Sequence, residues 1–290
     1  MNIITFDIEE WYIEKKFRGS RKEMYTKYNE MLTRILNILE KNDTKATFFC
    51  LGKIASEFPQ VVKRIAENGH EIGCHSNEHS WLTKMTPGQL RQDTIDAIKA
   101  LEDVSGQRVN SYRAPAFSIG DKNKWALEIL SECGIEYDAS IFPAVRDFGG
   151  FSSFSERTPC VIESNGCMIK EFPIPIVKLV GKEMAYSGGG YLRLFPYSFI
   201  EKQLNKADYG MCYFHIGDLI STPRKMMSKI DYETYFKETG TFVNRFKRYV
   251  KNSIGTGDAF EKMERLIKHI DFTNIAMSSS QITWTKTIKL

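Results

Sequence analysis

The sequence predicts an α/β protein, with a largely parallel sheet or barrel covered by helices on its outside. Short apolar runs alternate repeatedly with helical patterns in the first half of the chain. The runs are bounded by turn residues, and the helical stretches place apolar residues three and four positions apart. Such alternation is typical of parallel sheets, because neighbouring parallel strands need a crossover connection.

The elements follow one another with short connections. Pro59 opens one predicted helix and Gly69 closes it, which is the usual order of these two residues at helix ends. The apolar runs predict strands over 2–8, 46–52, 70–75, 111–115, 135–142 and 211–216. The periodic stretches predict helices over 22–41, 59–69, from Thr86 to Leu101, and over 121–133 and 197–207.

The pattern changes over residues 143–195. An Asn165-Gly166 turn, the proline-spaced run EFPIPIVK and a GGG run predict a β-rich insertion. Residues 220–290 are expected to form a C-terminal helical extension, with helices over 231–252 and 257–269 and then a polar tail. We see no linker-like segment, so residues 1–290 are expected to form a single domain.

Composition limits the possible partners. The chain has 290 residues, 42% of them hydrophobic, and a net charge of +4, which gives no concentrated basic surface for nucleic acid. We find neither a secretory signal nor an apolar stretch of about 20 residues. A cytoplasmic protein is expected, free or at the inner face of the membrane. The basic stretch 244–251 could touch phosphate or a membrane surface, although a solvated helix face is the simpler interpretation. The oligomeric state stays open.

Charged and titratable residues stand where the predicted strands end. Asp7 and Glu9 end the first strand, His75 and His79 follow the strand 70–75, and further candidates end later strands: Arg113, Asp138 and His215. The carboxyl ends of parallel strands carry the chemistry of α/β proteins. We therefore expect these side chains to converge on one rim.

The pair His75 and His79 is the strongest local signal for a metal. If HSNEH forms a helical turn, this spacing points both imidazoles the same way and suits one zinc ion. Asp7 and Glu9 point to the same side of a strand, so one can ligate while the other acts as a base. Each feature also has a structural explanation, since acidic residues often cap loops after strands.

The later residues have less specific signals. Arg113 could hold and orient a carboxylate, or form a structural ion pair. Asp138 could pair with that arginine or cap a turn. His215 could act as a general acid, although a lone histidine at a strand end is more often a hydrogen-bonded structural residue.

Taken together, the ordered motifs resemble those of a known family. TFDIEEW, HSNEH, RAPAFS, YDASIFP and YFHIGD, with GGGYLRL at 188–194, resemble the motif series of the polysaccharide deacetylases, carbohydrate esterase family four. The likeness covers about residues 1–220 and is greatest to the subgroup associated with bacterial exopolysaccharide and surface-glycan biosynthesis. It implies a deformed (β/α) barrel.

The resemblance also implies roles for the rim residues. Asp7 is implied as the catalytic base, Arg113 as the group that orients it, and His215 as the acid for the leaving amine. Glu9, His75 and His79 are implied as ligands of a divalent metal, with Glu10 left open as the acidic ligand. Zinc is expected, and cobalt, nickel or iron suit the same ligands.

Substrate contacts are predicted from residues next to the motifs. Aromatic side chains pack well against sugar rings, and the backbone N–H of Ala116 is a candidate for the oxyanion site. The predicted contacts are Trp11, Trp81, Ala116, Phe117, Asp138 and Tyr191. This chain departs from the family at Ile8, where better-known members have a second aspartate, and after His215, where the near subgroup has proline and tryptophan.

The predicted function is therefore metal-dependent hydrolysis of the N-acetyl group of an amino sugar in a glycan or glycan precursor. Two alternatives stay open. One is an amidohydrolase of cyclic amides or ureides on the same fold, and the other is a non-catalytic glycan-binding homologue.

Overall fold

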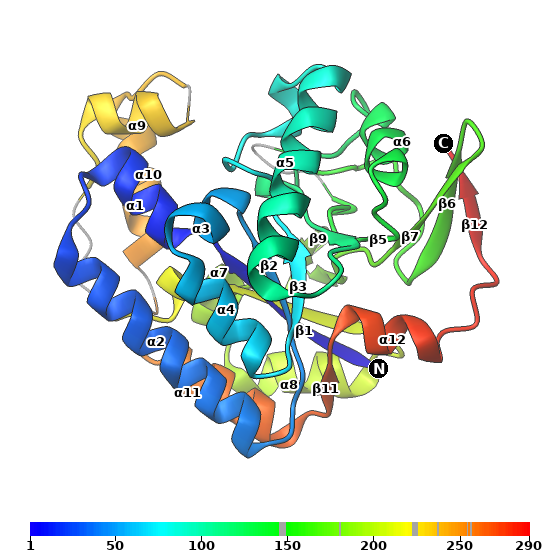
Figure 1. The fold of residues 1–290 in the computed structure, drawn as a ribbon. Helices are drawn as coiled ribbons and strands as arrows, with labels where there is room; N and C mark the ends of the chain where they lie inside the picture. Colours follow the sequence, from blue (N-terminus) through cyan, green and yellow to red (C-terminus); the bar gives the residue numbers. More distant parts are fainter. Residues whose placement is uncertain (145–148, 180, 222–225, 237, 254, 256) are drawn as a thin grey trace.

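The largest element of the computed structural model is a mainly parallel sheet (Figure 1). The structure describes residues 1–144, 149–179, 181–221, 226–236, 238–253, 255 and 257–290. Within them, ten strands pair in the order β10-β1-β2-β3-β4-β5-β7-β6-β12, and β11 adds to β1. Their bounds are β1 Asn2–Ile8, β2 Thr47–Cys50, β3 Glu71–Cys74, β4 Ser111–Tyr112, β5 Tyr137–Asp138, β6 Cys160–Ser164, β7 Cys167–Glu171, β10 Gly210–His215, β11 Phe272–Thr273 and β12 Thr287–Lys289.

Helices cover the outside of this sheet, so the predicted α/β class is confirmed. Figure 1 shows α2 and α11, far apart in the sequence, lying side by side, and the Arg34 guanidinium stacks 3.6 Å from the Phe260 ring between them. The covering helices are α2 Lys22–Lys41, α4 Pro59–Glu67, α5 Pro87–Ser105, α6 Trp125–Glu132, α8 Tyr197–Lys206 and α11 Ala259–His269.

The chain between β7 and β10 makes short backbone pairings with the neighbouring strands. Gly188 forms an isolated parallel bridge with Tyr213, and the N–H groups of Phe172 and Ile174 donate to the carbonyls of Asp138 and Ile141. A separate antiparallel hairpin, β8 Ile176–Leu179 with β9 Lys182–Ala185, joins these two edges. Of the predicted β-rich segment 143–195, β6 and β7 belong to the main sheet, and in the described residues only the β8–β9 hairpin forms a sheet of its own.

Alternation along β1 divides the core into two layers. Ile4, Phe6 and Ile8 pack in the cluster beneath the helices, whereas Ile3 belongs to a second cluster on the concave side. Thr5 and Asp7 share the parity of Ile3, so they also point to the concave side. Apolar residues are thus buried on both sides of the sheet, and the polar Thr5 and Asp7 of β1 lie on the inner side toward its carboxyl end.

Several predicted elements need correction. The helices α1 Glu10–Arg18 and α3 Gly52–Glu57 follow β1 and β2 where no helix was predicted. The predicted helix 231–252 is two helices, α9 Lys229–Phe236 and α10 Phe242–Ser253. Gly240 lies between them, where a Cβ would stand 3.0 Å from the Lys229 carbonyl oxygen. The expected polar tail contains β11, α12 Ile275–Gln281 and β12.

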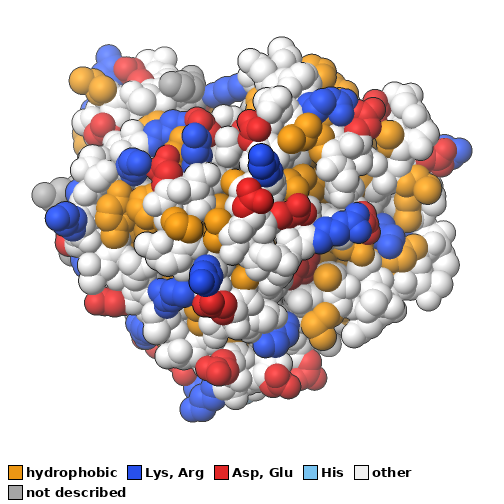
Figure 2. All heavy atoms as spheres, viewed as in Figure 1, with side chains coloured by type: hydrophobic (Ala, Val, Ile, Leu, Met, Phe, Trp, Pro, Cys, Tyr) orange, Lys and Arg blue, Asp and Glu red, His pale blue; other side chains and the backbone are white. Residues whose placement is uncertain are grey.

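The surface agrees with the modest net charge. On the face in Figure 2, acidic and basic side chains are interspersed with small apolar groups. Among the described residues, no helix is both long and apolar enough to cross a bilayer.

Candidate active site

Asp7 and His215 face each other because β1 and β10 run parallel in register. The ladder pairs Asp7 with His215, and His215 Nε2 lies 3.8 Å from Asp7 Oδ2. Asp7 is buried, whereas 34% of the His215 side chain is exposed. The imidazole therefore stands at the mouth of the site, and the carboxylate lies beneath it.

The Arg113 guanidinium holds the other oxygen of Asp7. Its Nη1 donates to Asp7 Oδ1 at 2.8 Å and to Thr5 Oγ1 at 2.7 Å, and its carbon lies 4.3 Å from the centre of the Phe49 ring. Arg113 follows β4 and is fully buried. A buried bond between charged groups orients a carboxylate strongly, so Asp7 has one oxygen fixed and one directed at His215.

A candidate metal centre lies beside this pair. Glu9, His75 and His79 each offer an atom within 4.8 Å of the others, and Glu9 Oε2 lies 2.7 Å from His79 Nε2 and 3.6 Å from His75 Nε2. Ligand atoms of a tetrahedral zinc site lie about 3.3 Å apart. Glu9 Oε2 is buried and receives no hydrogen bond from the described residues. A cation between these atoms would satisfy it.

The two histidines converge through a loop and not through the predicted helical turn. Ser76 and His79 have φ angles of 69° and 60°, which a right-handed helix excludes. The N–H groups of Gly52 and Lys53 bind the carbonyls of Ser76 and Asn77, so α3 fixes the loop. His75 Nδ1 lies 2.7 Å from the Arg113 carbonyl oxygen. That bond leaves Nε2 to face Glu9, as in the outer contacts of metal-binding histidines.

The electrostatics of the rim follow from this crowding. Burial alone would raise the pKa of Glu9, but His79 and His215 hold it well below its usual range. Burial alone would lower the pKa of His215, but Glu9 and Asp218 raise it well above its usual range. The site therefore favours an ionised Glu9 and a protonated His215.

Glu10 points away from the two histidines. Its Oε1 accepts a 2.5 Å hydrogen bond from the Gly217 N–H. Burial, together with the neighbouring Glu9 charge, raises the pKa of Glu10 to about 7. Of the two acidic residues left open by the sequence, Glu9 joins the metal cluster, and Glu10 holds the loop after His215.

Asp218 and Arg193 also contribute to the site, although no role was predicted for either from the motifs YFHIGD and GGGYLRL in which they stand. Asp218 Oδ2 lies 3.1 Å from His215 Nδ1, and Asp218 Oδ1 lies 3.2 Å from Arg193 Nη2. Asp218 lies in the short helix η3 Ile216–Asp218, and Arg193 lies in α7 Gly189–Leu194. A Cβ on Gly189 would come within 2.2 Å of the Asp218 carboxylate. The GGG run thus permits close packing of α7 against this aspartate.

The predicted substrate contacts divide into two groups. Trp81, Ala116 and Tyr191 are partly exposed. The Lys84 Nζ lies 4.2 Å from the centre of the Trp81 ring. Ala116 has a left-handed φ of 55° in η2 Pro115–Phe117, a conformation that costs about 1–2 kcal/mol outside glycine.

The other three predicted contacts are buried. Trp11 is 1% exposed and packs with its ring centre 5.5 Å from that of Tyr28. Phe117 packs edge-on against Tyr213 at 5.1 Å. Asp138 is 0% exposed and accepts hydrogen bonds from the N–H and hydroxyl of Ser140. In this structure, none of these three offers a face or an oxygen to a sugar.

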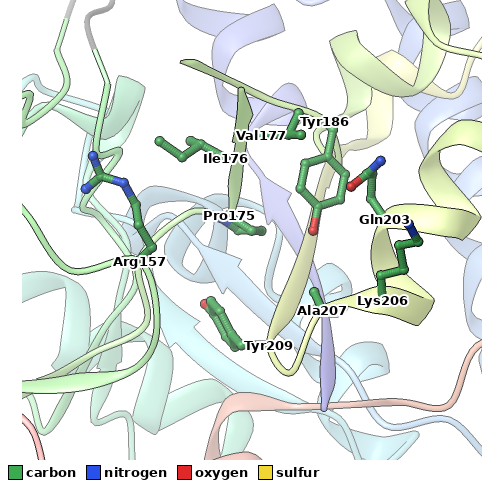
Figure 3. A pocket seen from close by; sticks show the side chains of 9 residues that line it. All are labelled: Arg157, Pro175, Ile176, Val177, Tyr186, Gln203, Lys206, Ala207 and Tyr209. Atoms are coloured by element: carbon green, nitrogen blue, oxygen red, sulfur yellow. The ribbon is translucent and has the colours of Figure 1, made fainter. Parts of the chain in front are cut away.

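A separate cavity of about 250 Å³ lies beside α8 and the β8–β9 hairpin (Figure 3). Tyr186, Gln203 and Lys206 line it, with Arg157 on the opposite wall. Its described lining contains neither a carboxylate nor an imidazole. The described lining therefore offers neither of the ligand types found in the Glu9, His75 and His79 cluster, and the candidate metal centre remains the one at the strand ends.

Comparison with known proteins divides the chain into two parts. Residues 3–137 match the model of the polysaccharide deacetylase family, and residues 139–279 match a domain of unknown function (DUF3473). The chain is 38% identical over 100 residues to peptidoglycan-N-acetylglucosamine deacetylase of Bacillus cereus. The aligned residues are 34% of this chain and 36% of that protein.

Two further matches cover very different shares of the chain. Peptidoglycan-N-acetylglucosamine deacetylase PgdA of Listeria monocytogenes is 36% identical over 101 residues, which are 35% of this chain and 20% of that protein. The chain thus spans about a third or less of these curated relatives. A crystal structure of a Mycobacterium smegmatis protein classed with the polysaccharide deacetylases superposes with a TM-score of 0.61 at 17% identity, over 98% of this chain and 91% of that one. At that identity the likeness concerns the fold alone.

Proposed function

We infer, for a chain whose residues 3–137 match the model of the polysaccharide deacetylase family, that the protein hydrolyses the N-acetyl amide of an amino sugar in a glycan or glycan precursor. The observation that supports this most is the meeting of three kinds of group at one edge of the sheet. A candidate metal centre, an oriented carboxylate and a protonated imidazole lie within contact distance of one another. Amide hydrolysis needs these three functions: carbonyl activation, a base for water and an acid for the amine.

Glu9, His75 and His79 would hold the cation. Their nitrogen and carboxylate donors suit zinc, with cobalt, nickel or iron as alternatives. When bound, such a cation would polarise the acyl carbonyl oxygen and make water in the site easier to deprotonate.

Asp7 supplies the base in this proposal. Arg113 occupies its Oδ1, so Oδ2 is the oxygen that takes a proton from water as the water oxygen bonds to the acyl carbon. The bond from Arg113 fixes the direction of that transfer, because the guanidinium is itself held by Thr5 and the Ala139 carbonyl. Arg113 is a positioning residue in this scheme.

His215 supplies the acid. Asp218 binds Nδ1, which leaves the Nε2 proton directed toward Asp7 and Glu9. As the carbon–nitrogen bond breaks, the amine nitrogen takes the Nε2 proton and acetic acid remains, which loses its own proton to solvent or to the released amine and leaves as acetate. The proton on Asp7 then returns to His215 across 3.8 Å or through solvent. The cycle ends with every group in its starting state.

The substrate is proposed to be an N-acetylated hexosamine unit during assembly of a surface glycan, in the cytoplasm or at the inner face of the membrane. The names of the Bacillus cereus and Listeria monocytogenes relatives support an N-acetylglucosamine unit. Trp81 and Tyr191 are partly exposed beside the motifs, and we propose that their rings pack against the sugar.

The test is acetate release from N-acetylglucosamine oligosaccharides by the purified chain. We expect activity to vanish after chelation and to return with zinc. His79→Ala should lose both activity and bound zinc, measured by elemental analysis, because two ligands hold the ion poorly. His269→Ala removes a half-exposed imidazole from α11 and serves as the matched control.

Some outcomes would contradict the proposal. Activity that survives both chelation and His79→Ala would exclude the metal-dependent route. Turnover of a cyclic ureide without any sugar substrate would favour the amidohydrolase alternative. Oligosaccharide binding by a zinc-loaded chain that releases no acetate would favour a glycan-binding protein.

A further inference from the structure

The helix α10 exposes a continuous aromatic and aliphatic surface. Phe242, Val243 and Phe246 are 63%, 55% and 48% exposed. The rings of Phe242 and Phe246 stack at 5.8 Å with 11° between their planes, and Phe246 contacts Tyr249 at 6.4 Å. Scattered apolar residues are normal on a protein surface, but a contiguous patch marks an interaction site.

The orientation of α10 is the reverse of an ordinary surface helix. Residues 242, 243, 246, 249 and 250 fall on one side at helical spacing, and all five are apolar or aromatic. On the opposite side, Arg248 stacks 4.0 Å from the Phe236 ring of α9. A surface helix usually buries its apolar stripe. Here a charged side chain packs inward and the apolar stripe faces solvent.

The charge of α10 identifies the partner. All of its charged residues are basic, namely Arg245, Lys247, Arg248 and Lys251. Lys247 is exposed and Arg245 partly exposed, and their helical positions flank the apolar stripe on either side. Aromatic residues bordered by basic ones suit the headgroup region of an anionic bilayer. A second copy would instead bring two basic helices together, which like-charge repulsion opposes.

α10 also lies at the catalytic end of the molecule. Figure 1 shows α9 and α10 beside α1, the helix that begins directly after Glu9. Phe17 of α1 contacts Tyr235 of α9 edge-on at 5.1 Å. Burial raises the pKa of Tyr235, and the charges of Glu9 and Glu10 contribute to the rise. A surface that docks α10 would therefore lie close to the rim of the site.

We propose that α10 docks this protein onto an anionic membrane surface. Phe242, Val243 and Phe246 enter the headgroup layer, and the exposed Lys247 contacts lipid phosphates, whereas Arg245 stays bonded to the Met227 carbonyl and adds only its charge. This interfacial binding needs no spanning helix. Insofar as it rests on the proposed function, docking would present the site to a glycan held at the bilayer by a lipid.

The experiment is vesicle flotation with the full chain. Vesicles of phosphatidylcholine are compared with vesicles that also contain about 30% phosphatidylglycerol. We expect binding to the anionic vesicles, weaker binding to the neutral ones, and weakening by high salt, where screening shortens to about 3 Å at 1 M. The double variant Phe242→Ser with Phe246→Ser should lose roughly tenfold or more in vesicle affinity, since it removes buried apolar area.

Two further variants complete the test. Lys247→Glu should weaken binding to anionic vesicles and leave binding to neutral vesicles unchanged. Met168→Ser changes a 68% exposed residue on β7 and should bind like the parent chain. Circular dichroism melting of each variant confirms that it is folded.

Three results would overturn the proposal: no binding by the parent chain, equal binding by the double variant, or self-association through this face in sedimentation without vesicle binding. Flotation involves no catalysis. Failure of the proposed deacetylase activity would therefore leave the docking result intact, and the reverse also holds.

Discussion

The two halves of this chain contribute to one site in different ways. Residues 3–137 supply Asp7, Arg113 and the candidate metal ligands from buried strand ends, each fixed by contacts within that half. Residues 139–279 supply His215 and Asp218 at the partly exposed mouth. In the proposed scheme the first half would thus carry the cation site and the base, whereas the acid would come from the second.

Because of this difference, neither half alone contains all of the groups that the proposed hydrolysis uses. The β1–β10 ladder places Asp7 opposite His215 across the two halves. The boundary near residue 138 falls within β5, so a single sheet continues through both matches. A family assignment based on the first half therefore describes the cation site well and leaves the acid group to the second half.

The largest effect is expected in the first half, from Asp7→Asn. Removing the proposed base should lower kcat by roughly 10²–10⁴-fold. Bound zinc should be retained, because Asp7 is outside the Glu9, His75 and His79 cluster. Acetate release and elemental analysis check the two parts together. Asp43→Asn, in an exposed left-handed turn that suits asparagine equally, is the control. More than a tenth of parent activity in Asp7→Asn would remove Asp7 from this role.

A smaller effect is expected in the second half, from Asp218→Asn. Losing the carboxylate on His215 Nδ1 should reduce amide hydrolysis on the order of tenfold, part of what a general acid contributes. Hydrolysis of a nitrophenyl acetate should change little, because that leaving group needs no proton. His215→Gln should show a still larger loss on the amide with little change on the ester. Asp218→Glu should restore part of the activity. Equal losses on amide and ester would point to a merely structural role for Asp218.

The smallest effect concerns the contact between the halves, where Asp138 and Glu171 pair across β5 and β7. Burial raises the pKa of both carboxyl groups, and for Glu171 the Asp138 charge adds to the rise. The folded chain therefore binds more protons than the unfolded chain above the usual pKa of 4.5. It loses stability as the pH rises toward the raised pKa of Glu171.

Glu171→Gln removes this titration and keeps an oxygen for the Ile141 N–H. Between pH 4.5 and alkaline pH, the free energy of unfolding of the parent should fall by about 1–3 kcal/mol relative to the variant. Denaturant titrations at several pH values measure this difference. The exposed Glu67→Gln should follow the parent curve. If the unfolding free energies of the parent and of Glu171→Gln changed in parallel with pH, the carboxyl pair would not hold a proton.

The sequence allowed the regular part of the fold to be predicted, because buried parallel strands appear as apolar runs. Prediction failed for elements that are too short to show a period and for elements whose ends are set by contacts between distant residues. α1 and α3 have only nine and six residues, too few for a clear helical period, and the burial of Trp11 depends on α1. α9 and α10 are separated at Gly240 by a close backbone approach that no periodicity records.

The site residues also divide into those whose position the local pattern predicted and those whose position depends on distant contacts. Strand alternation predicted that Asp7 and Glu9 share a side, and strand ends predicted that His75 and Arg113 converge with them. The left-handed residues Ser76 and His79 were not foreseeable from a spacing that also fits a helix. Asp218 stands 25 positions after Arg193 and meets it only because α7 packs on η3. The catalytic roles themselves stay predictions until the assays above are made.

The pairing of β12 with β6 has a consequence for solubility. In the described part of the chain, β12 is the outermost strand on that side of the sheet, and without it the five-residue edge of β6 would present unpaired backbone groups to other molecules. β12 itself offers little for another strand to extend, because it has three residues and ends in Lys289, whose side chain is 79% exposed. Short, lysine-bearing edges discourage sheet-to-sheet aggregation, so we expect this edge of the sheet to resist pairing with a neighbouring molecule.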